Sequence, residues 1–217
     1  GLLTLYETTG ELEWLQESVG LTTTMIEEFW DDQEGGFFFT GKSHESLIVR
    51  SKDYFDNATP SGNSVASEVL LRLAALTENE DYQRRATSVL RLVSESVRRY
   101  PSGFGRALGA IDFSLGPVKE IALIGDSTSQ ATRNLIKEVW TRYLPNKVVA
   151  QAAVGDQSPL ALVPLLRDRN LVQNLPTAYV CEHYTCKEPT TDPKKLASQL
   201  ALPDRSLQGK EAHSASD

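Results

Sequence analysis

An internal repeat with an offset of 68 residues constrains the fold of this chain more than any other feature of its sequence. Residues 2–9 and 70–77 share a Leu-Leu-x-Leu pattern that ends in threonine, and an aromatic residue, Trp14 or Tyr82, opens the next segment. Each copy continues as an apolar stripe with three- and four-residue spacing and is followed by a Gly-Phe pair. Repeated helical hairpins stack because none of them can bury its own apolar face. The repeat therefore predicts stacked helical hairpins, although two unrelated amphipathic hairpins would share part of the pattern.

The first ten residues read as the last two turns of an amphipathic helix that ends at Gly10. No capping residue and no methionine precede them. A helix of this length is marginal in water by itself. We therefore expect the chain to be the C-terminal part of a longer protein.

The segments outside the two hairpins are of mixed type. Residues 37–40 and 46–50 are predicted as a short β-hairpin, and Ser61 and Asn63 have the side chains of helix caps. A βαβ-like unit, in which a crossover helix joins two parallel strands, is predicted after residue 117. The expected elements are a helix at 63–77, strands at 118–124, 147–151 and 178–181, helices at 127–143 and 192–200, the latter capped by Asp192, and a short helix or turn at 160–167. Residues 203–217 are polar and aperiodic, which predicts a disordered tail.

The charge balance limits the partners of the chain. Its 22 Lys+Arg against 29 Asp+Glu give a net charge of −7, which argues against nucleic acid because phosphate binding needs clustered basic side chains. The longest apolar runs are far shorter than the ~18–20 residues of a membrane span, and no signal peptide is recognisable. We therefore expect a cytoplasmic protein with neither nucleic acid nor a membrane as partner.

The densest cluster of polar side chains precedes the predicted helix at 63–77. Two carboxylates, Asp53 and Asp56, could divide the roles of general acid and general base, and Asn63 could orient a substrate hydroxyl. Lys52 and Ser61 belong to the same predicted substrate site, because a helix start favours an anion or a polarised oxygen. The alternative is structural, since Asp and Asn build turns and Ser and Asn cap helices.

Two aromatic residues complete this predicted substrate site. Trp30 and Phe39 lie in a stretch that is rich in aromatic side chains and could provide a surface on which a sugar ring stacks. Packing in the hydrophobic core is the alternative role for the same side chains.

A Gly-Asp-Ser sequence at residues 125–127 follows the predicted strand at 118–124. In one class of serine esterases this pattern presents the nucleophile, here Ser127, which needs a base and an orienting acid. The downstream histidines are His183 and His213, and the partner motifs of that class are absent from the sequence. Asp126 and Ser127 also suit the start of a helix. The esterase therefore stays a third hypothesis for the function.

Cys181 and Cys186 enclose His183, which makes three side chains that could bind a metal. A structural zinc site would need a second pair of ligands, and the spacing differs from that of a redox Cys-x-x-Cys. The sequence therefore predicts either a local disulfide or two reduced thiols, with no metal and no cofactor.

Several widely spaced motifs, which occur in order from residue 1 to about residue 202, resemble the YyaL-like family of spermatogenesis-associated, thioredoxin-domain-containing proteins. The matching positions are Asp53, Asp56, Ala58, Pro-Ser-Gly-Asn-Ser at 60–64, Ile121, Gly125, Asp126, Leu-Pro-Asn-Lys-Val at 144–148, Thr-Ala-Tyr-Val-Cys-Glu at 177–182, Cys186 and Pro189. Gly125 and Asp126 belong to the family pattern, whereas a serine at position 127 does not, which weakens the esterase hypothesis.

The resemblance implies a thioredoxin-like domain followed by a six-hairpin α/α toroid, similar to N-acylglucosamine 2-epimerase and to related glycosidases. The expected fold is mainly α, a partial toroid with a small α/β insertion. Residues 1–117 would form hairpin repeats, residues 118–202 the insertion with the closing helices of the same domain, and residues 203–217 the tail. The thioredoxin-like part and the remaining toroid would be missing from this chain, and the exposed hairpin faces would favour a homo-oligomer.

The function expected from the resemblance is carbohydrate-related catalysis or binding of a sugar-like ligand, with epimerase-, isomerase- or glycosidase-like activity at Asp53, Asp56 and Asn63. The epimerase histidines have no evident counterpart, because His44 is the one histidine in the hairpin region. This favours the alternative, a non-catalytic interaction platform for a thioredoxin-like domain with a role in redox chemistry or protein quality control.

Overall fold

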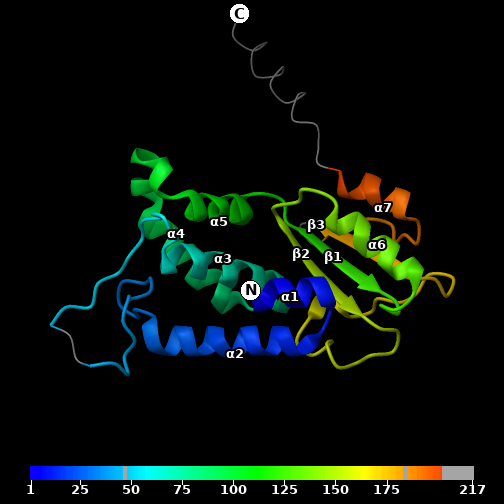
Figure 1. Ribbon diagram of the computed structural model, residues 1–217, viewed down its shortest axis with the longest axis horizontal. Helices are drawn as coiled ribbons and strands as arrows, with labels where there is room; N and C mark the ends of the chain where they lie inside the picture. Colours follow the sequence, from blue (N-terminus) through cyan, green and yellow to red (C-terminus); the bar gives the residue numbers. More distant parts are fainter. Residues whose placement is uncertain (46–47, 183–184, 202–217) are drawn as a thin grey trace, which may run out of the picture.

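A computed structural model describes residues 1–45, 48–182 and 185–201. Helices and strands alternate after a helical first half (Figure 1). The α-helices are α1 (Leu2–Thr9), α2 (Leu12–Phe29), α3 (Gly62–Thr77), α4 (Glu80–Arg99), α5 (Gly105–Leu115), α6 (Gln130–Trp140) and α7 (Pro193–Leu200), and two 3₁₀ turns are η1 (Pro101–Gly103) and η2 (Pro164–Leu166). The strands are β1 (Lys119–Ile124), β2 (Lys147–Ala152), β3 (Thr177–Glu182) and β4 (Thr185–Cys186).

The four strands form one mixed sheet in the order β2-β1-β3-β4. β1 and β2 are parallel, with Ile121 opposite Val149, and α6 connects them, which confirms the predicted βαβ unit. β3 runs antiparallel to β1, with Val180 opposite Ile121, and β4 adds a two-residue edge.

Both faces of the sheet are buried, and alternating residues of each strand point to opposite faces. One face presents Ile121 and Leu123 to α6 and α7, with Val149 and Val180 from the neighbouring strands in the same cluster. The other face presents its alternate residues to the helices of the first half, which lie on the opposite side of the sheet in Figure 1. The molecule therefore has three layers: helices α1–α5, the sheet, and helices α6 and α7.

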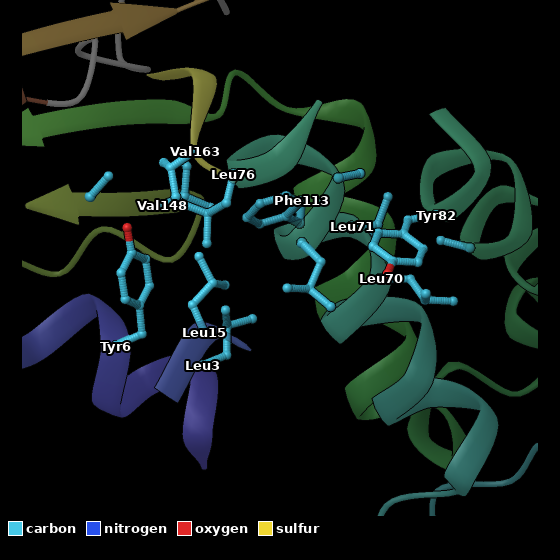
Figure 2. Packing of buried hydrophobic residues seen from close by; sticks show 14 of the residues in the cluster. Leu3, Tyr6, Leu15, Leu70, Leu71, Leu76, Tyr82, Phe113, Val148 and Val163 are labelled. Atoms are coloured by element: carbon cyan, nitrogen blue, oxygen red, sulfur yellow. The ribbon is translucent and has the colours of Figure 1, made fainter. Parts of the chain in front are cut away.

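The larger core joins the helical hairpins to the sheet. Figure 2 shows Leu76 of the second hairpin between Val148 of β2 and Leu15 of the first hairpin, with Leu3 next to Leu15. Val163, just before η2, enters the same cluster. The apolar faces of both hairpins are thus covered by the sheet as well as by each other.

The expectation of a mainly α, partial toroid is wrong, because the described residues form an α/β fold with seven helices and a four-stranded sheet. The two predicted hairpins exist, as α1 with α2 and α3 with α4. The prediction was wrong about what packs against these hairpins. In a toroid further hairpins would cover them, whereas here a sheet that is buried on both faces does so. The predicted domain division at residue 117 stays a prediction.

Most predicted helices and strands are confirmed within one to three residues, including the helix ended by Gly10, which has a left-handed backbone with φ of 77°. Asp192 caps α7 by accepting a hydrogen bond from the Lys194 N–H. The hairpin predicted from 37 to 50 forms no strands among its described residues, where the Phe39 N–H donates one bond to the Ser51 carbonyl. The predicted tail at 203–217 lies outside the described residues.

None of the helices in the described part of the chain has both the length and the apolar character required to cross a membrane.

Candidate functional site

Asp56, a predicted catalytic residue, holds together three segments of backbone. Its Oδ1 accepts a hydrogen bond from the Ser61 N–H at 2.9 Å, and its Oδ2 accepts bonds from the N–H groups of Arg106 and Ala107 at 2.7 and 3.0 Å. Phe104, the N-cap of α5, offers no side-chain acceptor, so Asp56 caps that helix from 50 residues away. Burial raises its pKa, but the three N–H groups and Ser64 outweigh burial and hold the pKa below the usual range.

The other polar residues predicted for the site also have partners within the protein. Asn63 is buried, donates to the carbonyls of Phe37 and Asp53 at 2.9 and 2.8 Å, and accepts from the Phe37 N–H at 2.7 Å. The Lys52 ammonium bonds to Asp31 at 2.6 Å and to the Gly35 carbonyl at 2.7 Å.

The remaining two polar residues predicted for the site make local contacts. Asp53 accepts from the Phe55 N–H at 3.1 Å, and Ser61 caps α3 through the Ser64 N–H, also at 3.1 Å. These polar side chains lie close together, and they form hydrogen bonds mainly with the backbone of the loop that leads into α3 and of its neighbours. A catalytic role for these residues stays a prediction.

The two predicted aromatic residues have different surroundings. Trp30 is buried and contacts the edge of Phe37, with ring centroids 5.1 Å apart, whereas Phe39 is 74% exposed. A pocket of about 390 Å³ borders Trp30, but its other lining residues come from 31–35 and from α4, and none belongs to the predicted polar cluster. These residues therefore do not form one concave site.

Ser127 follows β1 as predicted, in a turn that Asp126 organises. The Asp126 carboxylate accepts bonds from the N–H and the hydroxyl of Thr128 at 2.8 and 2.7 Å, and Ser129 caps α6. His183 and His213, the candidate bases, lie outside the described residues.

A cleft of about 530 Å³, larger than the pocket beside Trp30, lies where the helical layer meets the start of β2. It is lined by α1, α3 and α5 on one side and by the end of α6 with the turn into β2 on the other. We name it the α1–β2 cleft. Its lining residues include Glu7, Glu68, Arg72, Arg106, Asp112, Trp140, Arg142, Tyr143, Asn146 and Lys147.

A chain of alternating charges runs along the helical wall of this cleft. Glu7, only 2% exposed, forms an ion pair with Arg72. Arg72 also lies 3.7 Å from one carboxylate oxygen of Glu68, and the other oxygen forms an ion pair with the Arg106 Nε at 2.5 Å. Burial weakens the competition of water for the Glu7–Arg72 pair, so these two charges act on each other more strongly than at a surface, whereas the Arg106 side chain is half exposed.

Burial perturbs two ionisable groups of the cleft in opposite directions. It raises the pKa of Glu7, and the nearby cations Arg72 and Lys147 oppose this rise only in part. It lowers the pKa of Lys147, with Arg72 adding to the effect and Glu7 opposing it. Both groups are thus shifted toward their neutral forms. An acid and an amine shifted in this way are typical of functional sites.

The sheet side of the cleft adds hydrogen-bonding groups and aromatic surface. The Lys147 ammonium lies 4.7 Å from the centre of the Trp140 ring and donates to the Leu144 carbonyl at 3.2 Å. The Nε1 of Trp140 and the Nε of Arg142 are buried, and within the described ranges no acceptor bonds to either. Buried donors of this kind are uncommon in folded proteins.

Sequence reasoning missed the α1–β2 cleft because its residues are scattered from position 4 to position 147. One signal was present: Glu7 stands four residues after Leu3, on the apolar stripe of the first helix, where a charged side chain must be buried. Among residues 1–45, 48–182 and 185–201, no group of three His, Cys, Asp or Glu side chains could hold a metal ion.

Comparisons with known proteins give named relatives but no activity. No protein-family model matches the chain. Spermatogenesis-associated protein 20 of Homo sapiens is 36% identical over 202 residues, which are 92% of this chain and 26% of that protein. The Rattus norvegicus protein of the same name is 34% identical over the same shares, and an uncharacterized protein of Caenorhabditis elegans is 27% identical over 189 residues.

The chain therefore spans about a quarter of the length of the curated relatives that it matches. The resemblance drawn from the motifs of the sequence agrees with these names, while the toroid that it implied is absent from the described fold. These homologues support the assignment of the chain to the family of spermatogenesis-associated protein 20.

Proposed function

We propose that the chain binds a small, neutral, sugar-like ligand in the α1–β2 cleft. The observation that carries this proposal is the buried Glu7, whose pKa burial raises, in a cleft of about 530 Å³. A perturbed acid in a concave site with converging polar groups is the usual form of a binding or active site.

The lining of the cleft favours a polyhydroxylated ligand over a strongly charged one. The carboxylates of Glu68 and Asp112 pair with Arg106 and Asn146, the latter donating to Asp112 at 2.8 Å, so acceptors and donors face the same space. The rings of Trp140 and Tyr143 add apolar faces on which the C–H surface of a sugar ring can pack. Positive and negative side chains alternate, which leaves no strong excess of one sign for a multiply charged ligand.

If the cleft also catalyses a reaction, its acid and base are Glu7 and Lys147. Burial shifts Glu7 toward the form that donates a proton to a ligand oxygen and Lys147 toward the form that accepts one, which is the division of roles that opposite pKa shifts permit. Epimerase- and isomerase-like reactions use such an acid–base pair. In this proposal Asp53, Asp56 and Asn63 hold the loop before α3.

Ligand-observed NMR with a panel of neutral monosaccharides tests the proposal, with sugar phosphates and sugar acids as charged comparisons. We expect binding of at least one neutral sugar, weakened about tenfold or more by Lys147→Met, which removes a hydrogen-bonding partner of ~1.5–3 kcal/mol. Glu7→Gln should also weaken binding, because its amide has one acceptor oxygen where the carboxylate has two. Asp56→Asn should leave the affinity unchanged if it folds.

The outcome of this comparison separates the two candidate sites. Loss of binding in Asp56→Asn, with Glu7→Gln unaffected, would return the site to the loop at 53–64. Absence of binding by the whole panel would end the sugar proposal.

The second candidate function is that of an interaction platform for other parts of the full-length protein, including the thioredoxin-like domain that the resemblance implies. It is favoured by the loop between α2 and α3, where Phe39 (74% exposed), Val49 (74%) and Phe55 (49%) expose apolar side chains. Replacing Phe39 and Val49 by serine should abolish co-purification of the chain with the separately expressed N-terminal portion, whereas Glu7→Gln should leave it intact.

A further inference from the structure

A disulfide joins Cys181 of β3 to Cys186 of β4, which are register partners at the edge of the sheet. The two sulfurs differ in access: Cys181 is 2% exposed, whereas Cys186 belongs to the exposed residues. An attacking thiolate can therefore approach the Cys186 sulfur, and Cys181 is left as the inner partner.

A guanidinium group lies against both sulfurs. The terminal nitrogen of Arg169 is 3.2 Å from the Cys186 Sγ and 3.5 Å from the Cys181 Sγ. Arg169 belongs to the loop that follows η2 and leads into β3.

Neighbouring groups hold Arg169 in this place. Its guanidinium stacks over the ring of Tyr179 with 4.8 Å to the ring centre, and its Nε reaches the Leu165 carbonyl at 3.5 Å. The Tyr179 hydroxyl in turn fixes the next residue, Asn170, by donating to its carbonyl at 2.7 Å and accepting from its N–H at 3.1 Å. The cation is thus positioned by the sheet and by its own loop.

The placement of the cation favours the reduced form of the pair. A disulfide sulfur is a weak hydrogen-bond acceptor, whereas a thiolate carries a full charge that an adjacent arginine stabilises. The bond also closes a loop with a sequence separation of only 5 residues, so it constrains the unfolded chain less than a disulfide across a long loop would. These two features suit a reactive pair better than a structural one.

We propose that Cys181 and Cys186 form a thiol–disulfide exchange site that takes electrons from a dithiol, with Arg169 as the cation that stabilises the thiolates. A thiolate of the dithiol attacks the Cys186 Sγ and forms a mixed disulfide, while the electron pair of the broken bond goes to Cys181, whose thiolate lies beside Arg169. The second thiol of the dithiol loses its proton and attacks its own partner sulfur, which releases Cys186 as a thiolate. The dithiol becomes a disulfide, and its two electrons reside on the cysteine pair, which then takes up protons from water. This proposal is independent of the sugar-binding proposal.

Equilibration of the full chain with mixtures of reduced and oxidised dithiothreitol tests the role of Arg169. Alkylation with a maleimide and mass spectrometry count the free thiols, and circular dichroism monitors the fold. We expect full reduction without unfolding, and we expect Arg169→Gln to shift the equilibrium about tenfold toward the disulfide, as for the loss of about one pKa unit of thiolate stabilisation. Arg169→Lys keeps a cation at the site and should recover most of this shift.

Arg167→Gln is the matched control, because Arg167 lies two residues away, is exposed and donates to the Leu160 carbonyl. An equal shift in Arg167→Gln and Arg169→Gln would overturn the role of Arg169. Reduction that occurs only together with unfolding would show a structural disulfide and overturn the exchange site itself.

Single serine variants test the order of attack. In Cys181→Ser the exposed Cys186 should form a mixed disulfide with oxidised glutathione, and in Cys186→Ser the buried Cys181 should react at least about ten times more slowly. Equal rates in the two folded variants would contradict the assignment of Cys186 as the attacked sulfur.

Discussion

At the scale of single residues, the fold shifts the pKa values of two carboxylates in opposite directions. Asp56 accepts hydrogen bonds from three backbone N–H groups, which stabilise its charged form. Glu7 lies where burial destabilises its charge, and the Arg72 ion pair compensates only in part. A carboxylate with its backbone partners in place serves the fold, and one shifted toward its neutral form is available for proton chemistry.

Asp56→Ala should lower the free energy of unfolding at pH 7 by about 2 kcal/mol, because three N–H groups lose a charged acceptor and α5 loses its cap. The pKa of Asp56 is lowered in the folded state, so this stabilisation is present above the ordinary aspartate range and is lost as pH falls through the folded value. Urea unfolding at pH 7 and near pH 3 measures both effects. Asp32→Ala, at an exposed carboxylate, is the control and should change little; an equal loss in the two variants would contradict the capping role.

Glu7→Gln should change how stability depends on pH. The pKa of Glu7 is raised in the folded state, so the folded chain binds the proton more tightly and the free energy of unfolding falls as pH rises from the ordinary glutamate range through the folded value. Each unit of difference contributes about 1.4 kcal/mol. Between pH 4.5 and 8, the free energy of unfolding measured in urea should depend less on pH for Glu7→Gln than for the wild type. Glu13→Gln, at an exposed site, should show the same pH dependence as the wild type. If the free energy of unfolding varied with pH in the same way for the wild type and Glu7→Gln, Glu7 would keep the ordinary pKa of a glutamate.

At the scale of elements, α1 packs against β2, an outer strand of the sheet. β2 is an edge strand, and its outer edge would otherwise present backbone N–H and C=O groups to solvent. α1 lies against it, and the Gln151 side chain of β2 donates to the Glu7 and Thr8 carbonyls at 2.9 and 3.2 Å. A helix that is marginal alone is thus fixed at its C-terminal end by a strand.

Gly10→Ala should separate the role of this helix end from general helix propensity. Gly10 has φ of 77°, and an added Cβ would come within 2.9 Å of the Gln151 Cβ, so we expect a loss of about 1–2 kcal/mol from the left-handed conformation alone. Gly20→Ala, in the exposed interior of α2 with open space around it, should instead add about 0.5–1 kcal/mol. Urea midpoints measure both, and a stabilising Gly10→Ala would contradict the close approach of α1 to β2.

The sequence predicted these elements well because the signals are local. Apolar spacing, Gly10 and Asp192 mark helix ends that the structure confirms. The partners of the elements could not be predicted, since Leu3 and Val148 carry no mark that they share a cluster. The polar cluster before α3 was located for the same local reason, whereas the α1–β2 cleft joins residues more than 100 positions apart, such as Glu7 and Lys147.

At the scale of the whole molecule, one hydrophobic core connects the hairpins to the sheet. The cluster that contains Leu3 and Leu70 also contains Ala122 and Val148, so neither half can lose its structure without exposing apolar surface of the other. This continuity corrects the mainly α prediction, and it also predicts cooperative unfolding.

The two regions should therefore unfold together. A variant that keeps only Trp30 reports on the helical layer, and a variant that keeps only Trp140 reports on the end of α6. We expect the two fluorescence transitions in urea to coincide with each other and with circular dichroism. Two separate midpoints would contradict a shared core and favour independent units on either side of residue 117.

The contact between α1 and β2 can form only late in synthesis. The Gln151 side chain, which donates to the Glu7 carbonyl, is made 144 residues after Glu7. At ~5–20 residues per second this takes roughly 7 to 29 s. During that interval Leu3 and Tyr6 lack the strand that buries them, and α1 is too short to persist alone. Until β2 is made, α1 therefore exposes apolar side chains to which a chaperone can bind.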